Sequence, residues 1–548
     1  MSGIQHGLPL RRPTALRRLA AVCGCAALVA GCTNSGHHTQ PLGGSTPVSS
    51  AVSSNSAGPS AAISSGAAIA DPGAFASNLS FTDISDQVNK ALTGVTDRKL
   101  TFGRGVLKVP LDWANPANGK TVSITVIKIR SKSQHDRIGS LVVNPGGPGG
   151  SGTEAALDLA VSELPQAILD RFDIVGFDPR GVGLSDPIKC IPAKEKDAEL
   201  NMTPDPVSQA AWNANVAEET KVANECYAIY GADLTFYSTA ETVRDMEALR
   251  AKLGDAKLTY LGYSYGTLLG AEYASAYPDK VRALVLDGAV DPTISSADQD
   301  KTQAAGFQLA FSHFAANCEK KATCPLGHDP VGYVQNLMAS SDKNPIPSGS
   351  SKDKRVVQGG AVLLAVISAL YDESQWDQLT TALTDASKGD GSGVLALDDQ
   401  YNERQPDGTY TNIEDANATI ACADETDRTT VAQARALQTQ WRATNPLFGG
   451  SAAASLDYCS LWKAPPDKPI KVTDNDAPTV LVVGTTGDPA TPISGAKHLA
   501  ALLGSGDLLI WQGDGHTAYP KTDCITNVVD AYLIDAKAPA PGTTCPAS

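Results

Sequence analysis

The chain has 548 residues, 42% of them hydrophobic and 19% charged, so it is long enough to bury a large core and to hold about three domains. Its formal net charge of −15 argues against nucleic acid as a partner and against electrostatic docking on anionic lipid. No apolar run reaches the length of about 18 residues that marks a membrane-spanning helix. We therefore expect no membrane-spanning helix in this chain.

The first 32 residues are predicted to be an export signal rather than part of the fold. Four arginines between positions 11 and 18 precede an apolar stretch at 19–30 that is too short to span a bilayer. This stretch ends in Val29-Ala30-Gly31-Cys32, which has the form of a bacterial lipobox, in which Cys32 is acylated after cleavage. The alternative is an ordinary signal peptide with an incidental Cys32. We therefore expect an exported protein that contacts the outer face of the cell membrane only through a lipid on Cys32.

Residues 33–77 are predicted to form a flexible tether between the signal and the fold. The segment consists mainly of Ser, Gly, Ala and Pro, so it carries too few large apolar side chains to bury a core. The ordered part of the chain is expected to begin near Phe81.

Cysteine usage fits an exported protein. Of the 11 cysteines, three fall in the signal segment and eight remain, and an even number in an exported chain favours disulfides. Pairing neighbours in chain order gives four local loops, although eight cysteines allow roughly a hundred connectivities. Their spacing is not that of a zinc site, and we predict neither a metal nor a cofactor. The eight are Cys190, Cys226, Cys318, Cys324, Cys422, Cys459, Cys524 and Cys545.

The ordered part begins with a hairpin and continues as alternating strands and helices. Residues 106–112 and 122–129 alternate apolar and polar side chains around a turn signal at 115–119. Short apolar runs typical of buried parallel strands follow, separated by helical patterns such as 242–253. This alternation predicts an α/β fold with a mostly parallel sheet covered on both faces. The runs lie at 140–143, 172–177, 258–261, 283–287, 479–483 and 508–511.

The strand–helix alternation stops between residues 291 and 469. This region is rich in helical patterns and carries four of the eight cysteines. We interpret it as an inserted, mainly helical cap over the strand ends. The sheet-forming core would then be discontinuous, with one part at 78–290 and a second part at 470–548.

The pentapeptide Gly262-Tyr263-Ser264-Tyr265-Gly266 lies between the predicted strand at 258–261 and a helical pattern at 267–277. A Gly-x-Ser-x-Gly sequence at such a junction is a nucleophile elbow, a sharp and strained turn that lifts the serine hydroxyl out of the sheet. Side chains at the two glycines would collide with the neighbouring strand and helix. The alternative is a Gly-rich turn with an incidental serine.

A serine nucleophile needs a base and an acid that orients it, and these follow the elbow in the order Ser, Asp or Glu, His. Asp488 comes directly after the predicted strand at 479–483, and His516 lies in a Gly-flanked loop after the strand at 508–511. His516 would take the proton of Ser264 during attack, and Asp488 would fix the imidazole tautomer.

Two other residues compete for these roles. His498 lies within a helical pattern at 493–503, which favours a surface position. Asp514 is only two residues from His516 and could not easily reach the far nitrogen of the ring. We therefore prefer Asp488 and His516.

Stabilising an oxyanion requires two N–H donors. One is the backbone N–H of Tyr265, the residue after the predicted nucleophile. The other is expected from the Gly-rich loop at 144–152, where we favour Gly147 and keep Gly146 as the second choice. A phosphate-binding role for this loop is disfavoured, because no Gly-Lys-Ser/Thr follows it.

A third motif, Gly-Phe-Asp-Pro-Arg-Gly-Val-Gly-Leu-Ser at 176–185, joins the Gly-rich loop at 144–152 and the elbow at 262–267. Together the three motifs resemble the tripeptidyl aminopeptidases of actinobacteria, which are exported relatives of the prolyl aminopeptidases with an α/β-hydrolase fold. Gly487-Asp488-Pro489 and Gly515-His516 match the acid and base motifs of that family. The resemblance runs from about Thr101 to the C-terminus. The family's usual cysteine before the first core strand is absent near 102–104, so one family disulfide would be missing or rewired. The motifs are Asn-Pro-Gly-Gly-Pro-Gly-Gly-Ser-Gly at 144–152, Gly-Phe-Asp-Pro-Arg-Gly-Val-Gly-Leu-Ser at 176–185 and Gly-Tyr-Ser-Tyr-Gly-Thr at 262–267.

The resemblance implies a serine hydrolase of the cell envelope that releases short peptides from peptide N-termini through an acyl-enzyme. Relatives hold the free α-ammonium with carboxylates of the cap, and Asp424 and Glu425 are the best local match, although both could equally be solvated acids. A carboxylesterase or lipase is the second hypothesis, because the same triad transfers acyl groups from small esters. A surface-anchored binding protein on an inactive hydrolase scaffold is the third.

Overall fold

The computed structural model describes residues 71–321, 324–351, 353–474 and 476–548. The export signal, Cys32 and residues 33–70 of the predicted tether lie outside this part of the chain.

Ten of the twelve strands in the described residues form one sheet with the order β1-β2-β3-β5-β4-β6-β7-β10-β11-β12. The pairs from β1 to β5 in this order are antiparallel, and every pair from β5 to β12 is parallel. The predicted hairpin and the mostly parallel sheet are both confirmed. The strands are β1 (Phe81–Asp83), β2 (Leu100–Pro110), β3 (Thr121–Ser131), β4 (Gly139–Asn144), β5 (Phe172–Phe177), β6 (Leu258–Tyr263), β7 (Val281–Asp287), β10 (Val480–Gly487), β11 (Gly506–Asp514) and β12 (Thr544–Cys545).

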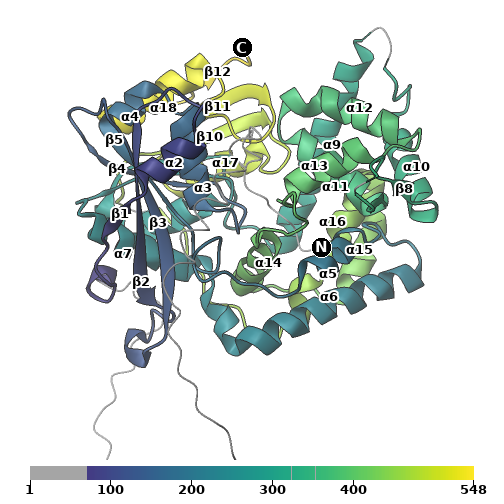
Figure 1. Ribbon diagram of the computed structural model, residues 1–548, viewed down its shortest axis with the longest axis horizontal. Helices are drawn as coiled ribbons and strands as arrows, with labels where there is room; N and C mark the ends of the chain where they lie inside the picture. The colour runs from purple at the N-terminus through teal and green to yellow at the C-terminus, as the bar shows by residue number, and fades with distance from the viewer. Residues whose placement is uncertain (1–70, 322–323, 352, 475) are drawn as a thin grey trace, which may run out of the picture.

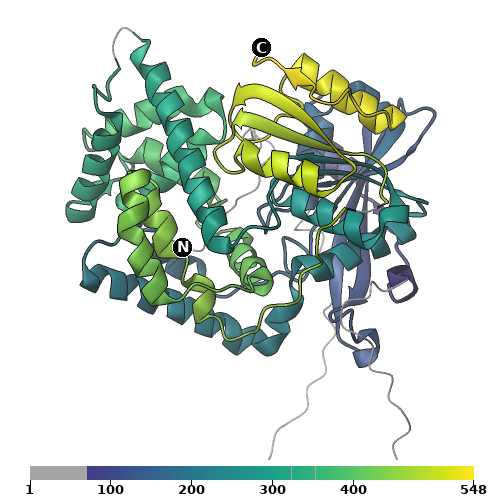
Figure 2. The same cartoon turned by 180° about the vertical axis from the view of Figure 1, so that it is seen from behind.

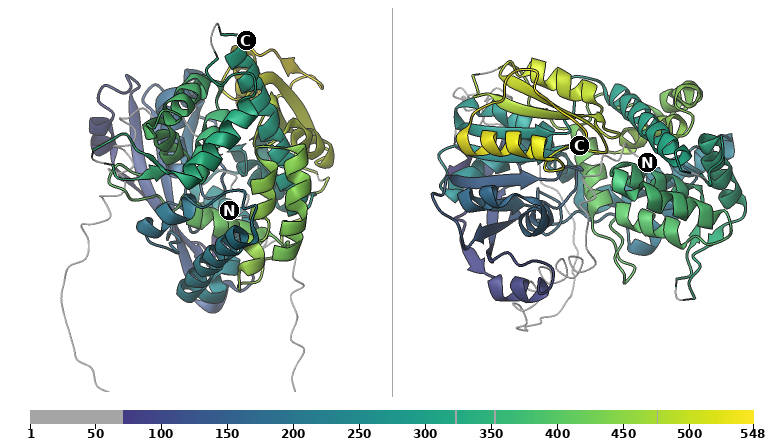
Figure 3. Two further views of the ribbon diagram at one scale, coloured as in Figure 1. Left: turned by 90° about the vertical axis from the view of Figure 1, so that its right-hand side faces the viewer. Right: turned by 90° about the horizontal axis from the view of Figure 1, so that it is seen from above.

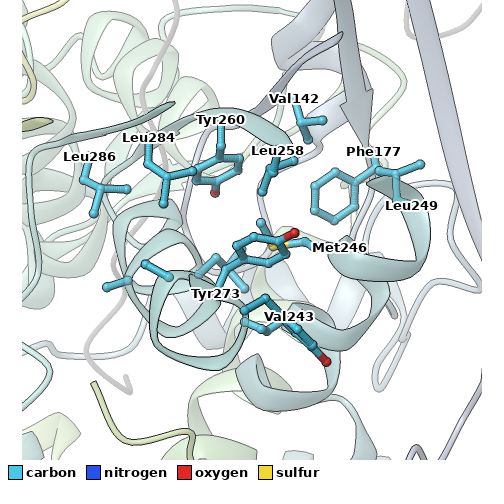
Figure 4. Close-up of a cluster of buried hydrophobic side chains, with 14 of the residues drawn as sticks. Val142, Phe177, Val243, Met246, Leu249, Leu258, Tyr260, Tyr273, Leu284 and Leu286 are labelled. Carbon is cyan, nitrogen blue, oxygen red and sulfur yellow. The ribbon is translucent and has the colours of Figure 1, made fainter. Parts of the chain in front are cut away.

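Helices cover both faces of the sheet, because the central strands bury their side chains on both sides. On one face the apolar cluster of Figure 4 joins Val142, Tyr260 and Leu284 of the strands to Val243 and Met246 of a helix. The helices of this face are α7 (Thr239–Leu253), α8 (Gly266–Ala276) and α17 (Ile493–Leu502). The helices of the other face are α2 (Ser85–Ala91), α3 (Gly152–Asp158), α4 (Gln166–Arg171) and α18 (Asp523–Asp535).

Between β7 and β10 the chain forms a helical unit that stands beside the sheet (Figures 1 and 2), and the view from above in Figure 3 shows the same arrangement. It has an apolar core of its own, which includes Phe307, Phe311, Phe314 and Trp376. The helices are α9 (Ser296–Glu319), α10 (Pro330–Lys343), α11 (Gly359–Leu370), α12 (Trp376–Ala386), α13 (Ser392–Tyr401), α14 (Ile413–Asp424), α15 (Val431–Thr444) and α16 (Gly449–Ser455), with a small hairpin of β8 (Ile346–Pro347) and β9 (Val356–Val357).

Two helices that precede the elbow also pack on this unit. They are α5 (Ala193–Leu200) and α6 (Gln209–Tyr230), both within the predicted first core segment at 78–290. Trp212 of α6 packs in one cluster with Ala434 and Trp441 of α15. The Nζ of Lys196 on α5 lies 2.7 Å from the Oδ1 of Asp415 on α14, and both side chains are buried. The helical unit therefore contains helices that precede the elbow in the chain as well as helices that follow it. The predicted domain boundaries placed only residues 291–469 in this unit.

The four disulfides of the described residues join neighbours in chain order, so the in-order pairing is confirmed among the alternatives left open. The pairs are Cys190–Cys226, Cys318–Cys324, Cys422–Cys459 and Cys524–Cys545.

Residues 72–77, which the sequence analysis assigned to the tether, pack against the fold, so the predicted end of the tether at residue 77 needs correction. A short 3-10 helix, η1 (Pro72–Ala74), packs against α7 and buries Pro72 and Gly73. The N–H of Ser77 then donates to the carbonyl of Lys108 on β2. The close approach to α7 leaves no room for a side chain at Gly73, whose Cβ would lie 2.8 Å from that of Ala251.

None of the helices in the described residues combines the length and apolar character that a bilayer crossing needs.

Candidate active site

The turn between β6 and α8 holds Ser264 in a strained conformation. Its φ of 55° lies in the left-handed region, which a non-glycine residue seldom adopts. The N–H of Ser264 donates to the carbonyl of Asp287 on the adjacent strand at 2.9 Å. The backbone N–H and the hydroxyl of Thr267 both donate to the carbonyl of Ser264. A Cβ on Gly262 would clash with the carbonyl of Gly266, so the expected need for glycine is confirmed.

The ends of β10 and β11 bring Asp488 and His516 together, as the sequence predicts. The Nδ1 of His516 lies 2.9 Å and 3.0 Å from the two carboxylate oxygens of Asp488, and both residues are buried. An Nδ1–H that donates to this carboxylate leaves Nε2 as the basic nitrogen of the ring.

Asp488 is held as a carboxylate. Burial by itself would raise its pKa, but the neighbouring His516 and several hydrogen bonds keep the pKa below the usual range. The backbone N–H groups of Ala490, Thr491 and Thr517 donate to its oxygens at 2.8–3.1 Å. The hydroxyl of Thr491 adds a bond of 3.1 Å to Oδ2 and lies 3.3 Å from the Nδ1 of His516. Sequence reasoning missed Thr491, whose only signal is a hydroxyl three residues after the acid.

Ser264 and His516 are neighbours but are not joined by a hydrogen bond. The carbonyl that accepts from the N–H of Ser264 belongs to Asp287, and a Cβ on the following Gly288 would lie 3.1 Å from the Cε1 of His516. Among the described residues, neither the Oγ of Ser264 nor the Nε2 of His516 has a hydrogen-bond partner, and both atoms are buried. Catalytic hydrogen bonds of free enzymes are often long and tighten when substrate binds.

The Gly-rich loop after β4 lies against the elbow. A Cβ on Gly146 would come within 2.9 Å of both the Cβ of Ser264 and the N of Tyr265. The N–H of Gly146 already donates to the side chain of Asn144. Within the described part of the chain, no acceptor takes the N–H of Gly147 or of Tyr265. Of the two candidate glycines, Gly147 thus has the uncommitted N–H, and its role as second oxyanion donor stays a prediction.

Helix α14 of the helical unit is linked to both parts of this predicted oxyanion hole, to the Gly-rich loop directly and to Tyr265 through Thr239. Near its start, the Nδ2 of Asn417 donates to the carbonyl of Pro148 at 3.0 Å. At its end, Asp424 accepts from the N–H and the hydroxyl of Thr239 at 2.8 Å and 2.5 Å. The same hydroxyl lies 2.5 Å from the phenol oxygen of Tyr265. Thr239 begins α7 and was not predicted, because only the folded chain brings α7, α8 and α14 together.

The two candidate ammonium ligands, Asp424 and Glu425, differ in the hydrogen bonds that their carboxylates accept. Both oxygens of Asp424 are taken by Thr239, and burial raises its pKa to about 7. Burial, reinforced by Asp427, also raises the pKa of Glu425 to about 7, and its Oε1 is buried without a hydrogen-bond partner. Glu425 is thus the more available carboxylate.

A further acid lies close to Glu425. Burial, and next the charge of Glu425, raise the pKa of Asp300 on α9 to about 8. A bound cation near Glu425 would stabilise the ionised forms of both carboxylates. Asp300 lies in a long helix with no local motif, so the sequence carried no signal for it.

His498 and Asp514, the two residues that competed for the roles of base and acid, form contacts with other side chains. The Nδ1 of His498 on α17 lies 2.5 Å from the Oδ2 of Asp291, and its side chain is half exposed. The Oδ1 of Asp514 lies 2.6 Å from the Nδ1 of His313 on α9.

Comparisons with known proteins agree with this geometry. A family model described as alpha/beta hydrolase fold matches residues 139–521. Serine protease Hip1 of Mycobacterium tuberculosis is 39% identical over 457 residues, which cover 80% of this chain and 86% of that protein. Carboxylesterase B of the same species is 33% identical over 449 residues, covering 80% and 85%. Tripeptidyl aminopeptidase of Streptomyces lividans is 31% identical over 462 residues, covering 80% and 83%. The chain therefore belongs to the α/β-hydrolase family, within the actinobacterial group that contains tripeptidyl aminopeptidases and serine protease Hip1.

Proposed function

We propose that this protein is a serine aminopeptidase of the cell envelope that releases tripeptides from peptide N-termini through an acyl-enzyme. The observation that carries the aminopeptidase assignment is the carboxylate of Glu425 in the helical unit, whose Oε1 is buried without a hydrogen-bond partner among the described residues, together with Asp300, which lines a pocket of the same unit. Relatives named as a serine protease and as tripeptidyl aminopeptidases support the same assignment.

The chemistry follows from the positions of five groups. Ser264 Oγ attacks the scissile carbonyl while His516 Nε2 takes its proton, and Asp488 holds the ring and stabilises the imidazolium. The N–H groups of Tyr265 and Gly147 bind the oxyanion of the tetrahedral intermediate. His516 then gives the proton to the leaving amine, and a water molecule hydrolyses the acyl-enzyme with the same base.

The carboxylate pair selects a free N-terminus. An α-ammonium beside Glu425 would compensate the desolvation of that carboxylate and offset the effect of its charge on Asp300. Asp424 is one residue away but already accepts two hydrogen bonds from Thr239, so it supports the elbow rather than the substrate.

Export and anchoring through acylated Cys32 are part of the proposal and rest on the pattern of residues 1–32 alone. Cys32→Ser should move the protein from the membrane fraction to the soluble fraction. Retention of this variant in the membrane fraction would contradict the lipid anchor.

A carboxylesterase is the second candidate. It is favoured by the relative named carboxylesterase B and by an apolar pocket in the helical unit. The same five groups would cleave an acyl ester without any need for the carboxylate pair.

The test compares hydrolysis of three substrates by the purified protein: a tripeptidyl anilide with a free N-terminus, its N-acetylated form and a short acyl ester. We expect strong preference for the free tripeptide and, in Glu425→Gln, a rise in KM of about tenfold for this substrate alone. Ser264→Ala is the control for contaminating hydrolases. Turnover of esters only would move the assignment to carboxylesterase.

A further inference from the structure

A pocket with a cavity volume of about 80 Å³ lies inside the helical unit, among α9, α11, α13 and α16. Its walls are mainly apolar and aromatic, and Asp300 is the one acidic group among them. The principal apolar residues are Ala304, Phe307, Leu363, Leu364, Ile367 and Phe448.

Two aromatic residues that line the pocket, Phe307 and Tyr401, pack against Tyr371, which contacts the predicted catalytic base. The ring of Phe307 lies 5.8 Å from that of Tyr371, and the ring of Tyr401 lies 6.1 Å from it. Tyr371 in turn meets the imidazole of His516 edge to face at 5.2 Å, and its carbonyl accepts from the N–H of His516. One aromatic layer therefore separates the pocket from His516.

The wall formed by α9 is also fixed to the loop that carries the predicted acid. The Nε2 of Gln303, which lines the pocket, donates to the carbonyl of Ala490 at 3.0 Å. A Cβ on Gly306 would lie 2.5 Å from the carbonyl of Pro489, so α9 and this loop are in van der Waals contact. The pocket thus keeps a fixed position relative to Asp488 and His516.

The chemistry of the lining indicates what fits. An N-terminal amino acid carries its ammonium and its side chain on one carbon, so both must be accommodated at one place. Asp300 offers a carboxylate to the ammonium, next to Glu425, and the remaining walls offer apolar surface. A cationic side chain would be desolvated against aromatic rings, and a small one would leave the pocket unfilled.

We propose that this pocket binds the side chain of the substrate's N-terminal residue and selects bulky apolar residues such as Leu, Ile, Met and Phe. The inference rests on the proposed aminopeptidase function and deepens it, because it names the class of peptide that the site accepts.

The experiment measures kcat/KM of the purified protein for anilides of X-Ala-Ala, with X as Leu, Phe, Ala, Gly or Lys. We expect Leu and Phe to exceed Ala and Lys by about 10- to 100-fold. Ala452→Phe fills the pocket from α16 and should reduce this ratio to near one, while Gly-Ala-Ala anilide and short esters keep their rates. Ala454→Phe is the matched control on the same helix, because it points about 200° away and does not line the pocket.

A widened pocket gives a second, independent readout. Ile367→Ala should shift the preference from Leu towards Trp, without a change in the rate for short esters. Equal rates for all X residues, or a Leu preference that survives Ala452→Phe in a folded protein, would overturn the pocket assignment and leave the aminopeptidase function standing. Hydrolysis of esters with no tripeptide turnover would overturn both.

Discussion

Two buried aspartates show how differently the sheet edge and the helical unit treat charge. Asp488 at the end of β10 accepts hydrogen bonds from His516 and from backbone N–H groups, and its pKa lies below the usual range. Asp398 on α13 receives one side-chain bond, from Asn402, and burial raises its pKa to about 8.

This difference in pKa and hydrogen bonding corresponds to the two roles proposed for the regions, catalysis at the sheet edge and substrate recognition in the helical unit. At the sheet edge, charge is fixed in advance by donors, which is what transition-state stabilisation requires. In the helical unit, acids such as Asp300 and Asp398 stay poorly compensated, so their charge responds to pH and to bound cations. This difference fits the proposal that the sheet edge performs the chemistry and that the helical unit recognises the substrate.

The largest effect is expected at the sheet edge. Ser264→Ala and His516→Ala should each lower kcat/KM by about 10⁴-fold or more, because members of a triad act as a unit. His498→Ala is the matched control and should keep near wild-type activity, since its side chain is half exposed on α17. Hydrolysis rates of the three variants on the preferred substrate test this prediction. Damage from His498→Ala with an active His516→Ala would show that the base is wrongly assigned.

The next effect concerns stability on the sheet side. Arg180 is fully buried, binds both oxygens of Asp245 and donates to the carbonyls of Leu111 and Phe236. Arg180→Ala leaves a buried carboxylate unpaired and should lower the free energy of unfolding by about 3–5 kcal/mol. Denaturant unfolding measures the loss.

An exposed ion pair provides the control for Arg180. Lys120→Ala removes the partner of Asp233 on the surface and should cost less than about 1 kcal/mol. Equal losses in the two variants would mean that the buried network is not what stabilises the sheet side.

A smaller effect is expected where the two regions meet. Thr239→Val removes the hydroxyl that bonds both Asp424 and Tyr265. We expect kcat to fall by about 10- to 100-fold for peptides and esters alike, with KM unchanged and weaker inhibition by a boronic acid, because the oxyanion donor shifts.

The matched control is Thr242→Val on the same helix, whose hydroxyl donates only to the carbonyl of Ser238. A loss in Thr239→Val confined to substrates with a free amine would instead assign Asp424 to ammonium binding.

The last effect is a pH dependence in the helical unit. A folded-state pKa above the unfolded value makes Asp398 favour folding below about pH 4, and this contribution is lost as the pH rises through about 8. Asp398→Asn should therefore stabilise the protein more at pH 8 than at pH 5, with a difference of about 2–4 kcal/mol between the two pH values.

Thermal unfolding at the two pH values measures the effect of Asp398→Asn. Asp385→Asn, on the exposed surface of α12, is the control and should show no pH-dependent gain. Stabilisation of Asp398→Asn at pH 5 and not at pH 8 would reverse the sign and contradict the assignment.

Most of the sheet and of the predicted triad could be read from the sequence, because the signals are local. Six apolar runs became strands, and Ser264, Asp488 and His516 each follow the end of a strand in a Gly-containing loop. The roles of Thr239 and Asp300 could not be read, because each depends on contacts between helices far apart in the chain. Asp424 shows the same limit: its position was anticipated, but not that Thr239 would occupy both of its oxygens.

The placement of α14 has a consequence for engineering. This helix belongs to the inserted region by sequence, yet it touches Pro148 at one end and Thr239 at the other. A chimera that takes its cap from a relative must therefore retain residues 413–424 with the recipient's sheet. The natural exchange points are the loops on either side of this helix, not the boundaries of the insertion.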